Sequence, residues 1–206
     1  LEANPDYALS HHDARVINTD GDTTKHSHIP ESNKRDFSQI DLMKSPFLLA
    51  LSLVVRNVFS RVPRGFVHCL NEDKVTISLA GKAGKGKFHC DVDPAVYRQH
   101  TGGIWSLQDD AYKAIAHTNT FRALHAYYAS SPQREVNEYL RKRYLDQLER
   151  LYRRNIQADE IREAVYVLKK AVITCLRAGQ KWEATLLLIR AVRFAGGHFR
   201  SKMTIS

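Results

Sequence analysis

In the second half of the chain, apolar residues recur every three to four positions, which is the spacing of one face of an α-helix. Val136, Leu140 and Tyr144 form one such stripe. Gly179 stands where a helix C-terminal cap belongs, and Gly196-Gly197 is expected to end the last stripe. Short connections make successive helices antiparallel neighbours, so a helical bundle is expected. The pattern predicts four helices, over about 106–129, 133–154, 159–178 and 181–195.

A shorter apolar run follows Pro46, which is a favourable residue for the first position of a helix. The run is apolar on nearly every side, as in a helix that is buried in a core. We therefore predict a core helix over 47–59, ended by Pro63 and Gly65. The run Phe47–Val55 is only nine residues long, whereas a membrane-spanning helix needs roughly 20 apolar residues, so no span is expected.

Residues 66–92 change to short apolar runs separated by turn residues, which is typical of strands. The first two runs are joined by Asn71–Lys74 and the last two by the glycine-rich segment Gly81–Lys87. The pattern predicts a small antiparallel β-meander with strands over 66–70, 75–79 and 88–92.

Residues 1–46 show no sustained period and are rich in Asp, Asn, Ser, Thr and His. Such a segment buries too little apolar surface to offset the entropy lost on ordering. We predict a flexible acidic tail over 1–46, followed by a single basic, mainly helical domain over 47–206. The expected fold class is α+β, predominantly α, with the meander placed before a C-terminal helical bundle.

Charge changes this picture, because the chain of 206 residues carries a formal net charge of +9. Residues 1–46 hold eight acidic and five basic side chains, so the remaining 160 residues carry +12. A concentrated positive field favours nucleic acid, an anionic lipid surface or an acidic protein as partner. A basic surface that serves solubility alone is the alternative.

The segment Gly81–Lys87 matches the spacing G-x-x-x-x-G-K of a phosphate-binding P-loop. Phe88 stands where a P-loop has the Ser or Thr that binds magnesium, and no helix is expected to follow, so nucleotide hydrolysis is disfavoured. Glycines let a main chain approach a phosphate backbone closely, and lysines neutralise its charge. We therefore take three residues of this segment as candidate polyanion contacts: Lys82, Lys85 and Lys87.

The predicted helices hold most of the remaining basic charge, and tyrosines such as Tyr144 and Tyr166 are interleaved with it. Arginine beside aromatic rings suits phosphate contacts and base stacking, especially on single strands and RNA loops. The alternative is a mixed-charge helix surface with tyrosines in the core. The candidate contacts in the helices are Arg141, Lys142, Arg143, Arg153 and Arg154.

Two His-Cys pairs, His68-Cys69 and His89-Cys90, are weak metal candidates. Adjacent residues on a strand point to opposite faces, so two paired strands supply only two ligands per face. A structural zinc site needs four ligands, so we expect neither a metal site nor a cofactor.

Catalytic motifs such as G-x-S-x-G, H-E-x-x-H and C-x-x-C are absent from the sequence. The leading interpretation is a non-enzymatic basic module that binds RNA, DNA or another polyanion within an assembly. The alternative is a protein–protein interaction or scaffold module, such as a viral structural or accessory protein or an intracellular effector, that docks an acidic partner or an anionic membrane. Self-association stays open in both. Three cysteines without framework spacing favour a reducing intracellular compartment, cytoplasmic or nuclear.

Overall fold

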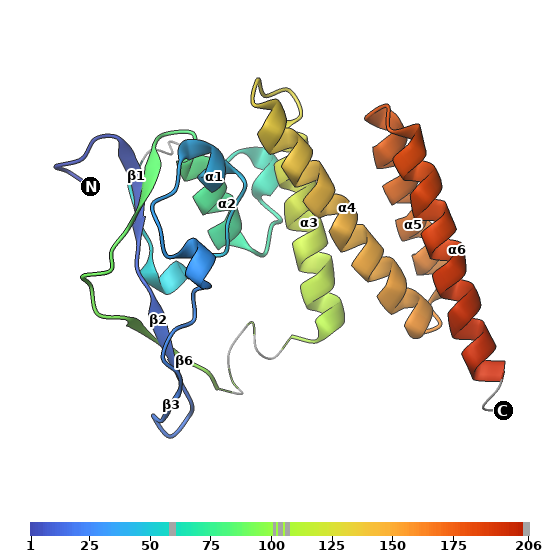
Figure 1. The fold of residues 1–206 in the computed structure, drawn as a ribbon, viewed down its shortest axis with the longest axis horizontal. Helices are drawn as coiled ribbons and strands as arrows, with labels where there is room; N and C mark the ends of the chain where they lie inside the picture. The colour runs from blue at the N-terminus through green and yellow to red at the C-terminus, as the bar shows by residue number, and fades with distance from the viewer. Residues whose placement is uncertain (58–60, 101, 103–104, 106–107, 204–206) are drawn as a thin grey trace.

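The computed structural model describes residues 1–203 apart from 58–60, 101, 103–104 and 106–107. The molecule is elongated: two small β-sheets and two short helices lie at one end, and four longer helices follow in a row toward the C-terminus (Figure 1). The fold is α+β and predominantly α, and its C-terminal part is a helical bundle. Within the described residues, no helix combines the length and apolarity needed to cross a membrane.

The N-terminal part contains two mixed three-stranded sheets, with strand orders β4-β1-β5 and β3-β2-β6. β1 pairs in parallel with β5, and β2 pairs in parallel with β6. β4 and β3 complete the two sheets as antiparallel edge strands. The strands are β1 Tyr7–His11, β2 Ala14–Ile17, β3 Thr23–Lys25, β4 Val54–Val55, β5 Lys85–Phe88 and β6 Ala95–Arg98.

The predicted flexible tail over 1–46 is wrong as a description of its structure. Leu9 on β1 and Ala14 on β2 are completely buried, and Val16 is almost so. α1 (Gln39–Met43) follows, begun by a capping box between Ser38 and Asp41. The strands are only four or five residues long and pair with segments about 80 residues away, so no local period revealed them.

Burial in this segment extends to a titratable side chain. His11, the last residue of β1, is completely buried between Phe37 and Phe88, with ring centroids 5.4 and 5.2 Å away. Burial disfavours the charged imidazolium and lowers the pKa of His11 to about 4.

The predicted meander over 66–92 is also wrong. Residues 66–70 contain the end of a 3₁₀ turn, and 75–79 lie in α2 (Glu72–Ala80). Val75, Ile77 and Leu79 are buried, and this alternation in the sequence resembles the pattern of a strand. Ser78 between them is buried as well, which a strand with one buried face would not show. Two acidic residues, Glu72 and Asp73, lie in the first turn of α2, where negative charge stabilises a helix.

The predicted core helix over 47–59 does not form in its described part, residues 47–57. A 3₁₀ turn, Ala50–Ser52, leads into β4, and Val55 pairs with Leu9. β-branched residues fit the extended backbone of an edge strand, which explains why Val54-Val55 leaves the helical conformation. Residues 58 and 59 of this prediction lie outside the described residues.

The four predicted C-terminal helices are confirmed. The N-cap of α3 is Asp109, whose side chain accepts a hydrogen bond from the backbone N–H of Tyr112. Gly179 follows α5 with a φ of +73°, as a left-handed cap requires. The last helix continues through Gly196-Gly197, so these glycines do not end it. The helices are α3 Asp110–Tyr128, α4 Arg134–Gln157, α5 Ile161–Arg177 and α6 Lys181–Met203.

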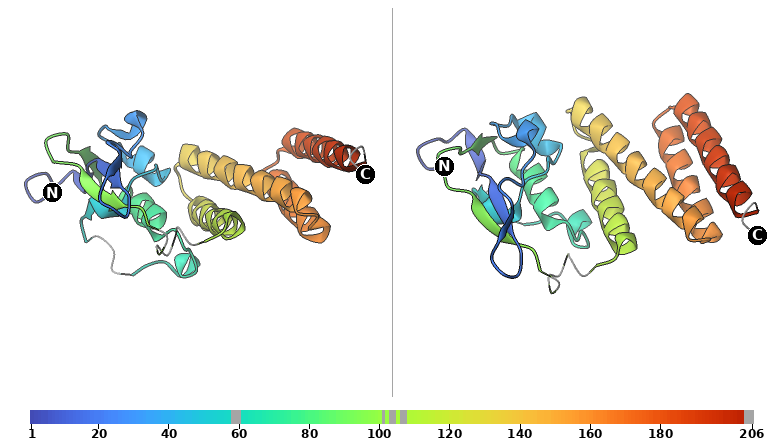
Figure 2. Two further views of the ribbon diagram at one scale, coloured as in Figure 1. Left: turned by 90° about the horizontal axis from the view of Figure 1, so that it is seen from below. Right: turned by 60° about the horizontal axis from the view of Figure 1, so that its bottom comes forward.

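The four helices alternate between two layers. α4 packs against α3 and α5, and α6 packs against α5 and α4. In Figure 2, α3 and α5 lie on one side of the row and α4 and α6 on the other. The hydroxyl of Tyr128 donates to the carbonyl of Ser78, which ties this array to α2. Alternation leaves α4 as the floor between α3 and α5.

Candidate nucleic-acid interface

Two glycines of Gly81–Lys87 are closely packed against backbone atoms of neighbouring segments. A Cβ added at Gly84 would lie 2.7 Å from the carbonyl oxygen of Asp6 and 2.8 Å from the nitrogen of Ala8. At Gly81 it would lie 2.7 Å from backbone atoms of Gln39 and Met43. The expectation that this segment joins two strands of a meander is also wrong. The segment links a helix to a strand, the reverse of the order in a P-loop.

Each lysine of this segment has a partner within the N-terminal part or at its border. Lys82 donates to the hydroxyl of Tyr127 at 2.8 Å. Lys85 lies 3.8 Å from a carboxylate oxygen of Asp6. Lys87 lies 3.0 Å from Asp36, and the hydrogen bond to this carboxylate raises the lysine pKa.

The candidate basic residues of α4 point toward different neighbours. Arg141 is buried and pairs with Glu183 of α6 at 2.9 Å. Arg143 lies over the ring of Phe121 of α3, 5.2 Å from its centroid. Three residues complete the set: Lys142 lines a hollow between α4 and α6, Arg153 pairs with Glu149 at 2.7 Å, and Arg154 pairs with Glu160 at 2.8 Å. Only Arg141 and Arg154 reach the hollow between α3 and α5.

That hollow, which we name the α3–α5 groove, has α4 as its floor. It consists of two adjoining parts of about 260 and 880 Å³. Arg122, Tyr144 and Lys170 line both parts, so the two lie side by side. Six basic residues line the groove against three acidic ones: Arg122, Arg134, Arg141, Arg154, Lys170 and Arg177 against Glu138, Glu160 and Glu163.

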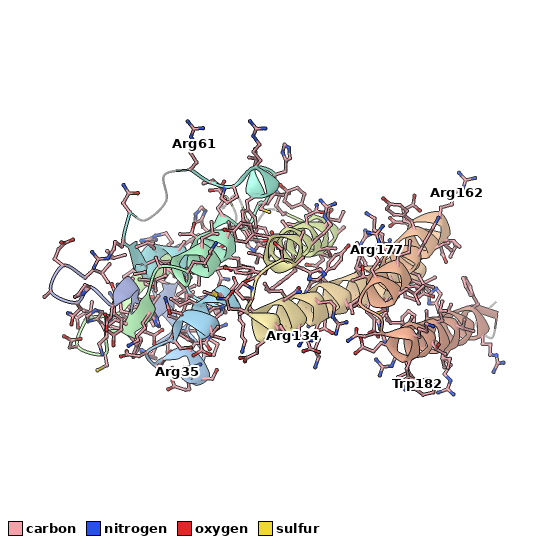
Figure 3. The ribbon with its side chains drawn as sticks, turned by 90° about the horizontal axis from the view of Figure 1, so that it is seen from above. Arg35, Arg61, Arg134, Arg162, Arg177 and Trp182 are labelled. Carbon is pink, nitrogen blue, oxygen red and sulfur yellow. The ribbon has the colours of Figure 1, made fainter. Side chains whose placement is uncertain are left out.

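Three arginines of the α3–α5 groove are exposed and make no ion pair within the residues that the structure describes: Arg122, Arg134 and Arg177. Arg134 begins α4, and Arg177 ends α5 (Figure 3). Arg61 and Arg162, by contrast, project away from the body of the molecule. The groove therefore gathers cations whose charge is available to a ligand.

An aromatic pair lies where the α3 wall meets the α4 floor of the groove. The ring of His125 stacks on Tyr144 with centroids 6.4 Å apart, and its Nδ1 is 2.9 Å from the side-chain oxygen of Asn137. Burial, together with the charge of Arg141, lowers the pKa of His125. Burial raises the pKa of the Tyr144 hydroxyl. Both rings are consequently neutral at pH 7.

A second tyrosine lies on the wall of the groove. The Tyr166 side chain on α5 is 58% exposed, and the Lys170 ammonium lies 4.3 Å from its ring centroid. Hydrogen bonding to Lys170 and the nearby positive charge lower the pKa of Tyr166. The ring therefore sits in a positive field with most of its surface open to solvent.

The two His-Cys pairs do not come together on neighbouring strands as expected. Cys69 belongs to the apolar core between α2 and α3, and burial raises the pKa of its thiol. Cys90 is exposed just after β5, and His89 lies 3.4 Å from Asp91. Over the described part of the chain, no three His, Cys, Asp or Glu side chains are grouped so that they could hold a metal ion.

Sequence reasoning missed most of the groove. Tyr166, Lys170 and Arg177 are spaced by four and seven residues, so they form one stripe along α5. Asn119 and Arg122 form a similar stripe on α3. Counting basic residues selected the dense runs on α4, whereas helical spacing of single polar residues on α3 and α5 would have found the walls.

Comparisons of the chain with protein-family models, with curated proteins and with solved structures gave no match. The functional conclusion therefore depends on the chemistry of the α3–α5 groove.

Proposed function

We propose that this protein is a non-enzymatic module that binds a polyanion, RNA or DNA, through the α3–α5 groove. The observation that carries the proposal is that Arg122, Arg134 and Arg177 line one concave surface and make no ion pair with any residue that the structure describes. An arginine fork matches the oxygens of a phosphate and holds them with two parallel hydrogen bonds. A row of such groups along a groove suits a ligand with regularly spaced phosphates.

The surrounding residues support the same ligand class. Lys170 adds a fourth cation that lines both parts of the groove. Asn137 and the neutral His125 offer polar atoms without adding negative charge. Low-dielectric walls on both sides concentrate the field of the cations in the groove and favour anionic ligands.

The test removes the three groove charges and keeps the fold. We expect the triple variant Arg122→Gln, Arg134→Gln, Arg177→Gln to bind a short labelled oligouridine RNA about tenfold or more weakly, since hydrogen bonds to charged groups are lost. The slope of log affinity against log salt should fall by about 2, because each phosphate neutralised on a single strand contributes about 0.7. Fluorescence anisotropy over a salt series measures both.

The matched control removes three exposed arginines outside the groove: Arg61→Gln, Arg64→Gln and Arg162→Gln. Both triples lower the net charge equally, so equal losses of affinity would show a general field effect and overturn the groove as the site. Absence of binding by the wild-type protein at low salt would overturn nucleic-acid binding itself.

A further inference from the structure

The smaller part of the α3–α5 groove differs from the larger part in what it offers a ligand. Exposed Tyr166 of α5 and Asn119 of α3 both line the smaller part. The Asn119 amide makes no hydrogen bond in the part of the chain that the structure describes. An open aromatic face beside a free amide is suited to a flat group that has hydrogen-bonding edges.

We propose that this part of the groove holds an unpaired nucleobase, stacked on Tyr166 and hydrogen-bonded at its edge by Asn119. The inference rests on the proposed function and names its substrate class, single-stranded nucleic acid. An asparagine side chain presents one acceptor and two donor hydrogens, which matches the edges of bases. Stacking on an aromatic ring accepts every base, because each has a π face.

The cations of the groove are placed to contact the phosphates next to the stacked nucleotide. Lys170 covers one face of the Tyr166 ring at 4.3 Å, so the base stacks on the other face. Arg122 and Lys170 line both parts of the groove and so stand between the base and the larger, more basic part. The phosphates that follow the stacked nucleotide would then run toward Arg177 and Arg134.

A duplex does not fit this arrangement. Bases in a duplex are paired and stacked on one another, and exposing one requires flipping it out of the helix. The smaller part, about 260 Å³, is close to the lower limit of ligand sites, which begin at roughly 300 Å³. It has room for one base and not for the stack of a double helix.

The experiment compares ligands that have the same phosphates and differ in their bases. Anisotropy titrations of the full chain use labelled oligouridine RNA, oligodeoxyuridine DNA, an abasic strand of equal length and a duplex of the same length. The wild-type protein should bind either single strand about tenfold more tightly than the abasic strand. Tighter binding of oligouridine than of oligodeoxyuridine would assign the ligand to RNA, and the reverse to DNA.

Substitutions then test whether the base stacks on Tyr166. Tyr166→Leu should remove this tenfold preference, so that base-containing and abasic strands bind the variant equally, whereas Tyr166→Phe should keep the preference. The control Tyr139→Leu changes another partly exposed tyrosine, on α4 in the hollow beside α6, and should have no effect. Asn119→Ala should reduce discrimination between oligouridine and oligoadenosine.

The outcomes separate the two proposals. A wild-type protein that binds abasic and base-containing strands equally would overturn the base site and leave the phosphate groove standing. A Tyr166→Leu variant that keeps the full preference would also overturn the site. A wild-type protein that binds none of the four ligands would overturn the proposed function and this inference with it.

Discussion

Basic residues in the N-terminal part and in the helical array have different surroundings. Lys82, Lys85 and Lys87 are dense in sequence, yet each contacts a hydroxyl or a carboxylate of its own chain. Arg122 and Arg177 are 55 positions apart, yet they face one groove without an ion-pair partner in the described structure. The density of charge along a sequence therefore says less about a binding surface than the partners that the fold supplies.

Glycine substitution gives the largest expected effect and tests whether the lysine segment is packed. In Gly84→Ala, the new Cβ would clash with the backbone of Asp6 and Ala8, and we expect a loss of about 3 kcal/mol in unfolding free energy. Urea denaturation measures it. The control Gly65→Ala meets no atom within 4 Å and should leave stability unchanged or slightly raised. Equal stability of both variants would mean that the segment is open and free to bind.

Acid should weaken the fold through His11, because its folded pKa of about 4 lies below the ordinary value of 6.5. The unfolded chain binds the proton more tightly, so stability is complete above pH 6.5 and falls as the pH drops toward 4. Between pH 7 and pH 5 the expected loss is about 2 kcal/mol. Urea denaturation at several pH values should show a smaller loss in His11→Leu. The same loss in both proteins would place His11 in a flexible tail after all.

Removing the carboxylate of Glu183 should release Arg141 from its ion pair and make its charge available to a ligand in the groove. Glu183→Gln leaves the guanidinium of Arg141 without its ion pair, and unfolding free energy should fall by about 1 kcal/mol, since Glu183 is half exposed. Affinity for single-stranded RNA should rise. A double-mutant cycle with Arg141→Met isolates the pair. Unchanged affinity would mean that Arg141 does not contribute to the groove.

The smallest effect is expected for the lysine segment. Since its three ammonium groups already have partners, Lys82→Ala, Lys85→Ala, Lys87→Ala should lower affinity for single-stranded RNA by less than about threefold. The loss in Arg122→Gln, Arg134→Gln, Arg177→Gln, measured beside it, should be larger. A loss in the lysine variant that matches the loss in the arginine variant would show that the three lysines contact the ligand despite their partners within the protein.

The helical array could be predicted from the sequence because its signals are local. A stripe such as Val136, Leu140 and Tyr144 recurs within two turns, and Gly179 marks a cap by its conformational freedom alone. The prediction failed at Gly196-Gly197, where propensity disfavours a helix but the helix continues.

The N-terminal sheets could not be predicted because their stabilising contacts are distant in sequence. β1 is paired by β5, nearly 80 residues later, and four or five residues contain too few positions to establish a period. Only some residues of the candidate site were among the residues that the sequence analysis named. Arg141 and Arg154 do line the groove, but its free cations come singly from α3, α4 and α5, and only the tertiary arrangement unites them.

The pair formed by Arg141 and Glu183 couples two events at opposite faces of α4. For a polyanion bound in the α3–α5 groove, the phosphates and the carboxylate of α6 compete for one guanidinium. Thermodynamic linkage makes this competition reciprocal: occupancy of the groove loosens α6 to the same extent that release of α6 tightens binding. Under the proposed function, the Glu183 carboxylate on α6 acts as a counter-ion for Arg141 and competes with a bound phosphate for its charge.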